Sequence, residues 1–290
     1  MMSSPAVSVV VPCYNSGRFI DALLKSLAAQ TFRDFEIIVV NDGSNDGETL
    51  RMLDRLRGRI KIIDQPNLHL SAARNTGFRA AAGEFVLPLD ADDTLAPGYL
   101  SETVNALRNA SPEVGFVFTH VKLRGALQGE IHGYFDRFDQ LFLNRLPYCM
   151  LIRKSAWAKV GGYDEAMRRG MEDWEFNIRL AAAGYRGLVI EKALFNYMVR
   201  PDGMLLSQSA RIQGTIWLNI RSKHRDLYKL AALGPMLRGK SGVVRSLIRA
   251  GALFGAAKIL PVAWFDALFF RTLMAARSWR IKRGKLVATI

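Results

Sequence analysis

Hydrophobic residues in the first 90 positions alternate between two spacings. Short aliphatic runs predict buried strands at 7–11, 36–40, 60–63 and 85–89. Between these runs, apolar residues recur every three or four positions and predict helices over 16–30, through Leu50 to Leu56, and over 72–82. Such alternation is typical of a mostly parallel sheet flanked by helices, so we expect an α/β, Rossmann-like fold.

Polar turns follow all four predicted strands. These turns are Pro12-Cys13-Tyr14-Asn15, Asn41-Asp42-Gly43-Ser44, Asp64, and Asp90-Ala91-Asp92-Asp93. Ligands of open α/β sheets bind beyond the carboxyl ends of the strands, so these acids are expected to gather at one edge and form a site. Taken singly, each Asp or Asn could instead serve a turn or a helix cap.

The pattern beyond residue 100 is less regular. Residues 114–151 mix short strand-like pieces with aromatic and glycine-rich stretches, which fits either an acceptor-facing surface or an ordinary β extension. Further on, Phe176, Leu180 and Ala183 have helical spacing. They predict a short helix that begins at Glu172 and is closed by Gly184.

The charge is unevenly distributed along the chain. Its 290 residues, half of them apolar, carry a formal net charge of +14. Residues 1–204 hold 24 basic and 24 acidic residues, whereas 205–290 hold 16 basic residues against two acids, Asp226 and Asp266. This step predicts a catalytic domain over 1–204, followed by a basic, mainly helical segment over 205–290.

Two cysteines, Cys13 and Cys149, lie far apart and have neither metal-ligand spacing nor a disulfide framework. We interpret them as buried small residues in a protein of a reducing compartment. The apolar run 6–11 is too short for a signal-peptide core and ends at Pro12. The expected location is therefore the cytoplasm.

Asp90-Ala91-Asp92 has the chemistry of a diphosphate site. A leaving nucleotide diphosphate gains negative charge in the transition state, and a divalent cation held by carboxylate can stabilise that charge. Asp-x-Asp by itself is common in surface turns. The apolar run 85–89, which leads directly into it, makes the metal hypothesis stronger here.

Six motifs in this order resemble those of the family 2 glycosyltransferases, which have the GT-A fold. They are Val10-Val11-Pro12-Cys13-Tyr14-Asn15, Val40-Asn41-Asp42-Gly43-Ser44, Ala73-Arg74-Asn75-Thr76-Gly77, Leu89-Asp90-Ala91-Asp92-Asp93, Gly161-Gly162-Tyr163-Asp164 and Glu172-Asp173-Trp174. The resemblance covers about residues 6–200. It implies inverting transfer of a sugar from a nucleotide-diphosphate sugar, commonly a UDP-sugar, with Mg²⁺ or Mn²⁺, to a glycan, glycolipid or glycoprotein acceptor.

The resemblance also assigns donor-site residues. It implies that Pro12, Tyr14 and Asn15 line the nucleotide pocket and that Asp42 accepts a hydrogen bond from the base. Asp64 would contact the base as well, although Gln65-Pro66-Asn67 also fits a turn. Arg74 would lie on the ribose and phosphate side, with a surface ion pair as the alternative. Asp90 and Ala91 would contact the nucleotide, and Asp92 would bind the metal.

For the second half of the site, the resemblance implies that Asp173 is the general base for the acceptor hydroxyl. Glu172 and Trp174 are acceptor candidates, with a helix-start acid and a core aromatic as the alternatives. Arg200 would return to the diphosphate. Family members often have a metal-binding histidine soon afterwards, but 201–209 contain no histidine, and Asp202 and Ser207 are the obvious oxygen donors there.

A processive-synthase signature is incomplete in this chain. Gln213-Gly214-Thr215-Ile216-Trp217 resembles Gln-x-x-Arg-Trp but has Ile216 in the arginine position. We therefore expect a non-processive enzyme.

The basic segment allows two interpretations. Val244, Leu247, Ile248, Gly251 and Phe254 share one helical face, with Arg245 and Arg249 about 140° away on the same helix. Lys258, Pro261 and Asp266 interrupt the apolar run, which makes a membrane span improbable. The segment could dock on an anionic membrane surface, at the inner face of the cell membrane, or it could pack on the catalytic domain.

Two other functions compete with sugar transfer. The basic segment could bind nucleic acid, but its aromatic residues lie in apolar runs and do not alternate with the basic ones. No nucleic-acid partner is therefore expected. A nucleotidyltransferase could share the acidic strand ends, but no glycine-rich phosphate loop follows the first strand.

Overall fold

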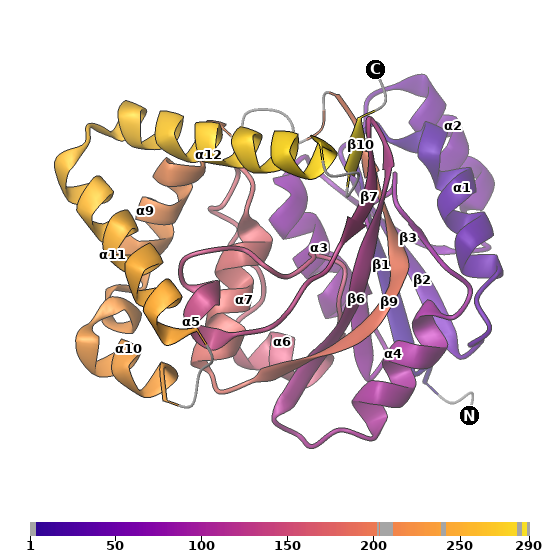
Figure 1. Ribbon diagram of the computed structural model, residues 1–290. Coiled ribbons are helices and arrows are strands. Elements are labelled where there is room, and N and C mark those ends of the chain that lie inside the picture. The colour runs from indigo at the N-terminus through magenta and orange to yellow at the C-terminus, as the bar shows by residue number, and fades with distance from the viewer. Residues whose placement is uncertain (1–3, 202, 204–210, 239–241, 283–285, 289–290) are drawn as a thin grey trace.

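One ten-stranded sheet organises the chain (Figure 1). The computed structural model describes residues 4–201, 203, 211–238, 242–282 and 286–288. The strand order is β10-β7-β6-β8-β4-β1-β2-β3, and β9 pairs with both β6 and β5. Most of the ladder length is parallel and helices flank the sheet, which confirms the predicted fold class.

The four strands predicted before residue 90 are confirmed. β1 (Val7–Cys13) runs parallel to β2 (Phe35–Asp42) and β4 (Phe85–Pro88), and β2 runs parallel to β3 (Lys61–Gln65). Because these strands share one direction, their carboxyl ends meet at one edge of the sheet.

The connecting helices cover both faces of these strands. They are α1 (Gly17–Ala28), α2 (Gly47–Leu56) and α3 (His69–Ala80). Val9 of β1 belongs to the apolar cluster that includes α1 and α2, whereas Val10 packs with α3 on the opposite face. Gly77 allows that close approach, because a Cβ there would lie 2.2 Å from Val10 Cγ1.

The middle of the chain extends the sheet. The elements are β5 (Thr94–Leu95), α4 (Tyr99–Arg108), β6 (Val114–Gly125), β7 (Leu127–Ile131), α5 (Arg137–Gln140), β8 (Leu151–Arg153), α6 (Lys154–Lys159), α7 (Glu172–Ala182) and β9 (Arg186–Val199). Short strands were expected here, but β6 has 12 residues and β9 has 14. Exposed Glu191 and Lys192 divide the apolar residues of β9 into two short runs, so the full length of the strand does not show in its sequence.

The predicted helix over 172–184 corresponds to α7. It begins at Glu172, and Gly184 after its end has φ +93°, a left-handed conformation that favours glycine. Glu172 and Asp173 are therefore the first two residues of this helix, as predicted.

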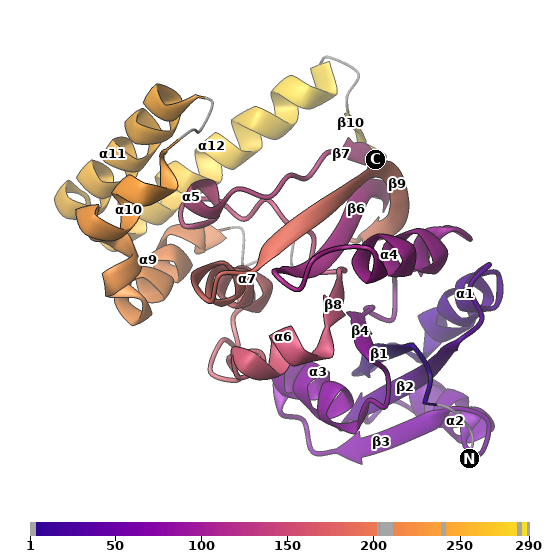
Figure 2. The ribbon, with the colours of Figure 1, turned by 90° about the horizontal axis from the view of Figure 1, so that it is seen from below.

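The C-terminal segment is helical and packs beside the sheet (Figures 1 and 2). It contains α9 (Gln213–Lys223), the 3₁₀ turn Arg225–Tyr228, α10 (Leu230–Met236), α11 (Val243–Ile259), α12 (Val262–Lys282) and β10 (Leu286–Ala288). One apolar cluster joins Phe142 and Trp174 to Trp217 and Phe265, so residues from both sides of position 204 share a core. Among the described residues, no helix is long and apolar enough to cross a membrane.

Candidate donor and catalytic site

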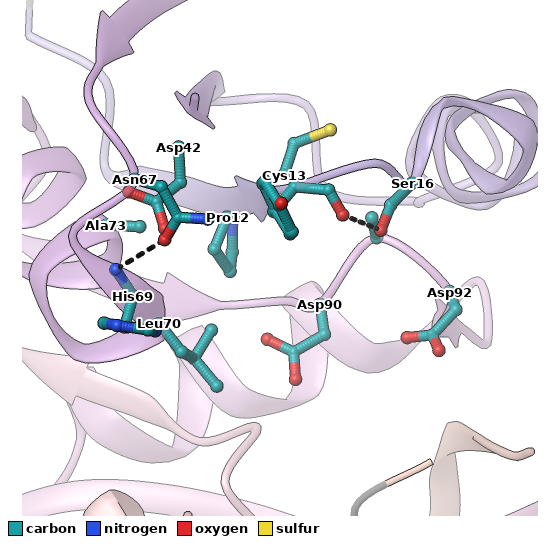
Figure 3. A pocket seen from close by; sticks show the side chains of 12 residues that line it. Pro12, Cys13, Ser16, Asp42, Asn67, His69, Leu70, Ala73, Asp90 and Asp92 are labelled. Atoms are coloured by element: carbon teal, nitrogen blue, oxygen red, sulfur yellow. Dashed lines mark hydrogen bonds between the residues drawn. The ribbon is translucent and has the colours of Figure 1, made fainter. Parts of the chain in front are cut away.

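A hollow lies at the carboxyl ends of β1, β2 and β4 (Figure 3). It is lined by Pro12, Cys13, Tyr14, Ser16, Asp42, Asn67, His69, Leu70, Ala73, Asp90, Ala91 and Asp92. The structure thus brings together six of the predicted donor residues from three separate turns. Figure 3 shows Asp42 at the upper left, Asp90 below the centre and Asp92 to its right.

Asp42 is buried and held in a fixed orientation. Its Oδ1 accepts hydrogen bonds from Gln65 Nε2 at 2.7 Å and from the Leu68 amide at 2.8 Å. Asp64, the other predicted base contact, is not among the residues that line the hollow. Its half-exposed carboxylate pairs with Arg57 Nη2 at 2.9 Å and accepts a bond from Asn41. Those hydrogen bonds, from Asn41 first and then Arg57, hold the pKa of Asp64 below its usual value.

Tyr14 and Asn15 have different roles in the turn after β1. Tyr14 is exposed and lines the hollow. Asn15 has φ 49°, and its side chain points to the turn after β2, where Oδ1 accepts the amide of Asn45 at 2.9 Å. Its Nδ2 donates to Asn45 Oδ1 at 2.8 Å. In this structure Asn15 therefore fixes the two turns to each other and does not line the hollow.

Arg74 is one of the most deeply buried charges of the protein, with 1% of its surface exposed. Its Nη2 donates to Asp90 Oδ1 at 2.8 Å and its Nη1 to Glu172 Oε1 at 2.6 Å. The guanidinium also lies over the ring of Tyr148 at 4.8 Å. Burial favours the neutral form, but the charges of Asp90 and Glu172 outweigh it and keep the pKa of Arg74 above its usual value.

This burial rules out the surface ion pair considered for Arg74, because its terminal nitrogens bind carboxylates in the interior. One of these carboxylates, Asp90, lines the hollow, so the placement of Arg74 on the ribose and phosphate side stays a prediction. Glu172, expected near the acceptor, is buried as the partner of Arg74. The pair joins the Asp90 turn to the start of α7.

Trp174 is a core residue and not an acceptor platform. It has no exposed surface, and its indole Nε1 donates to the Gln140 carbonyl at 2.6 Å. The expectation of an acceptor contact is therefore wrong for Trp174, and the core alternative is confirmed.

Asp173 lies next to Glu172 and is only partly exposed. Asn144 Nδ2 donates to its Oδ2 at 2.9 Å, and the Trp174 amide donates to its Oδ1 at 2.8 Å. Burial, followed by the neighbouring charge of Glu172, raises the pKa of Asp173 to about 6. A carboxylate with such a pKa can accept a proton near neutral pH better than an ordinary aspartate can.

A hydrogen-bond network that the sequence does not reveal holds the turn of Asp90. The Tyr148 hydroxyl accepts the Asp90 amide at 3.0 Å and donates a short hydrogen bond to the Asp93 carboxylate. Asp93 also accepts the amide of Met198 in β9 at 2.6 Å. Burial, then the charges of Asp92 and Asp90, raise the pKa of Asp93 well above its usual value. Asp93 is thus an internal anchor of the turn.

Asn75, next to Arg74, fixes the Gly161-Gly162-Tyr163 loop. Its Nδ2 donates to the Tyr163 carbonyl at 2.8 Å, and its Oδ1 accepts the Tyr163 amide at 2.8 Å. A Cβ on Gly162 would lie 2.6 Å from that Oδ1, and Gly162 has φ +76°, so only glycine fits there. Two motifs recognised in the sequence are therefore one structural unit.

Arg200, predicted to return to the diphosphate, lies beside the Asp92 carboxylate. Its Nη1 is 3.5 Å from Asp92 Oδ2, and its guanidinium lies over the Phe19 ring at 5.2 Å. The two oxygen donors considered after it, Asp202 and Ser207, lie outside the described residues.

Asp92 and its neighbours offer few ligands for a divalent cation. Within the described part of the chain, no group of three or more His, Cys, Asp or Glu residues is placed to hold a metal ion. Mg²⁺ sites commonly use only one or two carboxylates, with substrate phosphates and water completing the shell. Burial, then the charge of Asp90, raise the pKa of Asp92 although Arg200 lies beside it, so the positive charge of Arg200 compensates these effects only in part. Asp92 therefore fits as one ligand of a divalent cation whose other ligands include the phosphate oxygens of a bound nucleotide diphosphate.

Replacing Tyr148 with phenylalanine is expected to loosen the Asp90 turn. The substitution leaves the Asp93 carboxylate and the Asp90 amide each without one hydrogen-bond partner, which should lower the free energy of unfolding by about 1–3 kcal/mol. Urea denaturation measures this change. The matched control is Tyr134→Phe, which removes a more exposed hydroxyl bound to Asp139 and should lower stability by less than about 1 kcal/mol. Equal effects of the two substitutions would contradict the anchoring role.

Comparison with known proteins agrees with this site. A family model described as "Glycosyl transferase family 2" matches residues 8–158. This match covers more than half of the chain, which therefore belongs to that family.

The chain is 26% identical over 279 residues to the glycosyltransferase GlyA of Streptococcus pneumoniae, covering 89% of this chain and 39% of GlyA. It is 41% identical over 118 residues to the putative glycosyltransferase EpsH of Bacillus subtilis, covering 40% of this chain and 33% of EpsH. It thus spans well under two thirds of the length of either relative.

Solved structures share the fold. S. aureus TarS 1–349 in complex with UDP-GlcNAc superimposes with a TM-score of 0.59 at 20% identity, covering 96% of this chain and 92% of that one. The mannosyltransferase PcManGT from Pyrobaculum calidifontis, in complex with GDP-Man and Mn²⁺, gives a TM-score of 0.58 at 20% identity, with 98% and 85% coverage. The expectation of a GT-A glycosyltransferase fold is confirmed.

Proposed function

We propose that the chain is an inverting, non-processive glycosyltransferase. It would transfer a sugar from a nucleotide-diphosphate sugar, with a UDP-sugar as the first candidate, to a hydroxyl of a glycan, glycolipid or glycoprotein. The observation that carries this proposal is the buried chain Asp90–Arg74–Glu172, which connects the hollow to the start of α7, where Asp173 lies.

In this proposal the hollow receives the nucleotide. Asp42 uses Oδ1 for internal hydrogen bonds to Gln65 and Leu68, so Oδ2 is the oxygen to bind the base. Tyr14 and Pro12 form the wall, and Asp90 and Ala91 lie on the ribose side. Arg200, beside Asp92, supplies positive charge where the diphosphate leaves.

Asp173 is the proposed general base. As the acceptor oxygen attacks the anomeric carbon, Asp173 takes the hydroxyl proton, and the nucleotide diphosphate departs from the opposite side. A single displacement of this kind inverts the anomeric configuration. Asn144 orients the carboxylate for this step through the bond to Oδ2. Asp92 would hold Mg²⁺ or Mn²⁺, which when bound stabilises negative charge on the diphosphate.

The relatives support the donor class. TarS and PcManGT have been solved with UDP-GlcNAc and GDP-Man respectively, so both nucleotides need testing. The buried free thiols Cys13 and Cys149 suit the cytoplasm, where we place the reaction. Burial raises the pKa of Cys13 to about 11, which keeps this thiol protonated and unreactive.

A screen of nucleotide-sugar hydrolysis tests the proposal. Purified protein is incubated with UDP- and GDP-sugars and with Mg²⁺, Mn²⁺ or EDTA, and the released nucleotide is quantified. We expect slow hydrolysis of one donor that depends on the cation. Asp92→Ala should lower it at least about 100-fold, the size of effect seen when a stabiliser of transition-state charge is removed.

The matched control for this screen is Asp54→Ala, which changes a 73%-exposed carboxylate on α2 and should leave hydrolysis unchanged. Full activity of Asp92→Ala, or full activity in EDTA, would overturn the proposed role of Asp92.

A further inference from the structure

Large apolar side chains are exposed together on the C-terminal helices. On α11 these are Val244, Leu247 and Ile248, and around the turn into α12 they are Ile259, Val262, Trp264 and Leu268. Ile259 is 80% exposed, Val244 70% and Trp264 69%. Large apolar side chains exposed at several positions of neighbouring elements mark a candidate interaction site.

Helix α11 has two apolar faces. Ser246 and Ala250 are buried on the inner face, with Leu253 and Ala257 partly buried beside them. At 100° per residue, Val244, Leu247, Ile248, Gly251 and Ile259 lie on the opposite face, which points to solvent. The sequence grouped most of this outer set as the apolar face, yet packing on the rest of the protein uses the other side. The outer face is therefore not needed for the core.

The most exposed part is the turn between α11 and α12. We call Ile259, Val262 and Trp264 the apolar corner. In Figure 1 this turn lies at the outer left edge of the molecule, on the side away from α1 and α2. Phe265, one residue beyond the apolar corner, is buried, and Asp266 accepts the Thr215 amide at 2.7 Å. The corner is thus fixed from within while its apolar side chains remain outside.

The helices that carry these apolar residues also carry exposed cations. Arg245, Lys258 and Arg271 are exposed on the same helices, and the segment 205–290 carries 16 basic residues against two acids. Both acids are engaged, Asp266 with Thr215 and Asp226 with Lys229. A second copy of this chain would present the same positive charge, which opposes self-association through this face.

An anionic lipid surface matches both features. Its headgroups attract Lys and Arg, and its acyl boundary accepts aliphatic and indole side chains. Nucleic acid would match the charge but would leave Ile259 and Val262 without a partner. We propose that the outer face of α11, the apolar corner and the exposed start of α12 dock on an anionic membrane, with the apolar corner entering the headgroup and acyl boundary.

Vesicle binding by the whole protein tests this inference. Flotation assays compare vesicles of phosphatidylcholine alone with vesicles containing 30% phosphatidylglycerol, at low and high salt. We expect binding to the anionic vesicles that weakens with salt. Arg245→Gln/Lys258→Gln should weaken binding by about fivefold for each charge removed. Ile259→Ser/Trp264→Ser should weaken it by at least about tenfold.

The intrinsic fluorescence of Trp264 gives a second readout. Of the five tryptophans, Trp157, Trp174 and Trp217 are buried and Trp264 is 69% exposed. We expect anionic vesicles to shift the emission of the native protein to shorter wavelength, and comparison with Trp264→Phe separates the contribution of Trp264 from that of the fifth tryptophan, Trp279. The shift should shrink in Trp264→Phe.

The matched control is Leu50→Ser/Leu188→Ser, which removes exposed apolar side chains on α2 and β9 and should leave vesicle binding unchanged. The Ile259→Ser/Trp264→Ser protein, here called the corner variant, should hydrolyse the donor at the native rate without vesicles. This result separates lost docking from lost folding. Equal binding to neutral and anionic vesicles, native binding by the corner variant, or binding to RNA that competes with vesicles would each overturn the inference.

Discussion

Asp173→Asn is expected to reduce sugar transfer by about 10²–10⁴-fold in kcat, the range associated with loss of a positioned general base. The amide is nearly isosteric with the carboxylate and can still accept the bond from Asn144, but it cannot take the proton of the acceptor hydroxyl. The measurement is kcat for transfer with the donor found in the hydrolysis screen. An Asp173→Asn enzyme with native kcat would exclude this residue as the base.

The same variant should fold at least as well as the native protein. Because the pKa of Asp173 is raised to about 6, ionising this residue destabilises the folded state, and that effect appears as pH rises from about 4 to about 6. At pH 8 the substitution should increase the free energy of unfolding by on the order of 1 kcal/mol, since the side chain is partly exposed. At pH 4 the two proteins should be equally stable.

The native pH–rate profile provides a further check on Asp173. Activity requires the ionised carboxylate, so kcat should rise with pH through about 6 and then level off. The residual activity of Asp173→Asn should lack this inflection. An unchanged inflection would assign it to another group.

Arg74→Ala is expected to be the most destabilising single substitution in the site, by about 3–5 kcal/mol. It leaves the carboxylates of Asp90 and Glu172 without their shared cation, and Glu172 has only 4% of its surface exposed. Arg74→Lys should be intermediate, because one ammonium group cannot reproduce the two-sided contact of the guanidinium. Urea denaturation monitored by circular dichroism gives the free energies.

Arg79→Ala is the control for Arg74, since it lies on the same helix, is 58% exposed and pairs with Glu165 only at 3.6 Å. Its effect should be within about 0.5 kcal/mol. If Arg74→Ala were no more destabilising than Arg79→Ala, the buried chain between the hollow and α7 would not be a structural connection.

The sequence predicted the first half of the fold well because periodicity reports burial directly. β1 and β4 are buried along their whole length, and α1 has the expected apolar face. β9 was not predicted, since its exposed residues interrupt the apolar pattern and its stability comes from pairing with β6. Pairing between residues as distant as Val121 and Phe195 cannot be inferred from local periodicity.

In the site, too, the residues at strand ends were predictable from the sequence, whereas contacts between distant segments were not. Pro12, Asp42 and Asp92 were found because parallel strands bring their ends together. The partners of these residues come from distant segments that have no motif, such as Tyr148 and Asn144. Asp93 belonged to the recognised motif, but only its bond to Met198 in β9 shows that it anchors the turn. The burial of Arg74 was not predicted, because its partner Glu172 lies 98 positions further along the chain and only the fold brings the two together.

The last described strand, β10, gives the helical segment a fixed geometry. It pairs antiparallel with β7 through Leu286 and Gly129, so the described part of the C-terminal segment ends in a strand of the same sheet that contains β9 (Figure 1). A segment held by the sheet at both ends has a constant reach. If the apolar corner rests on a bilayer, the height of Asp173 above the lipid is set by the fold, and the enzyme would choose among acceptors by how far their hydroxyl stands from the membrane.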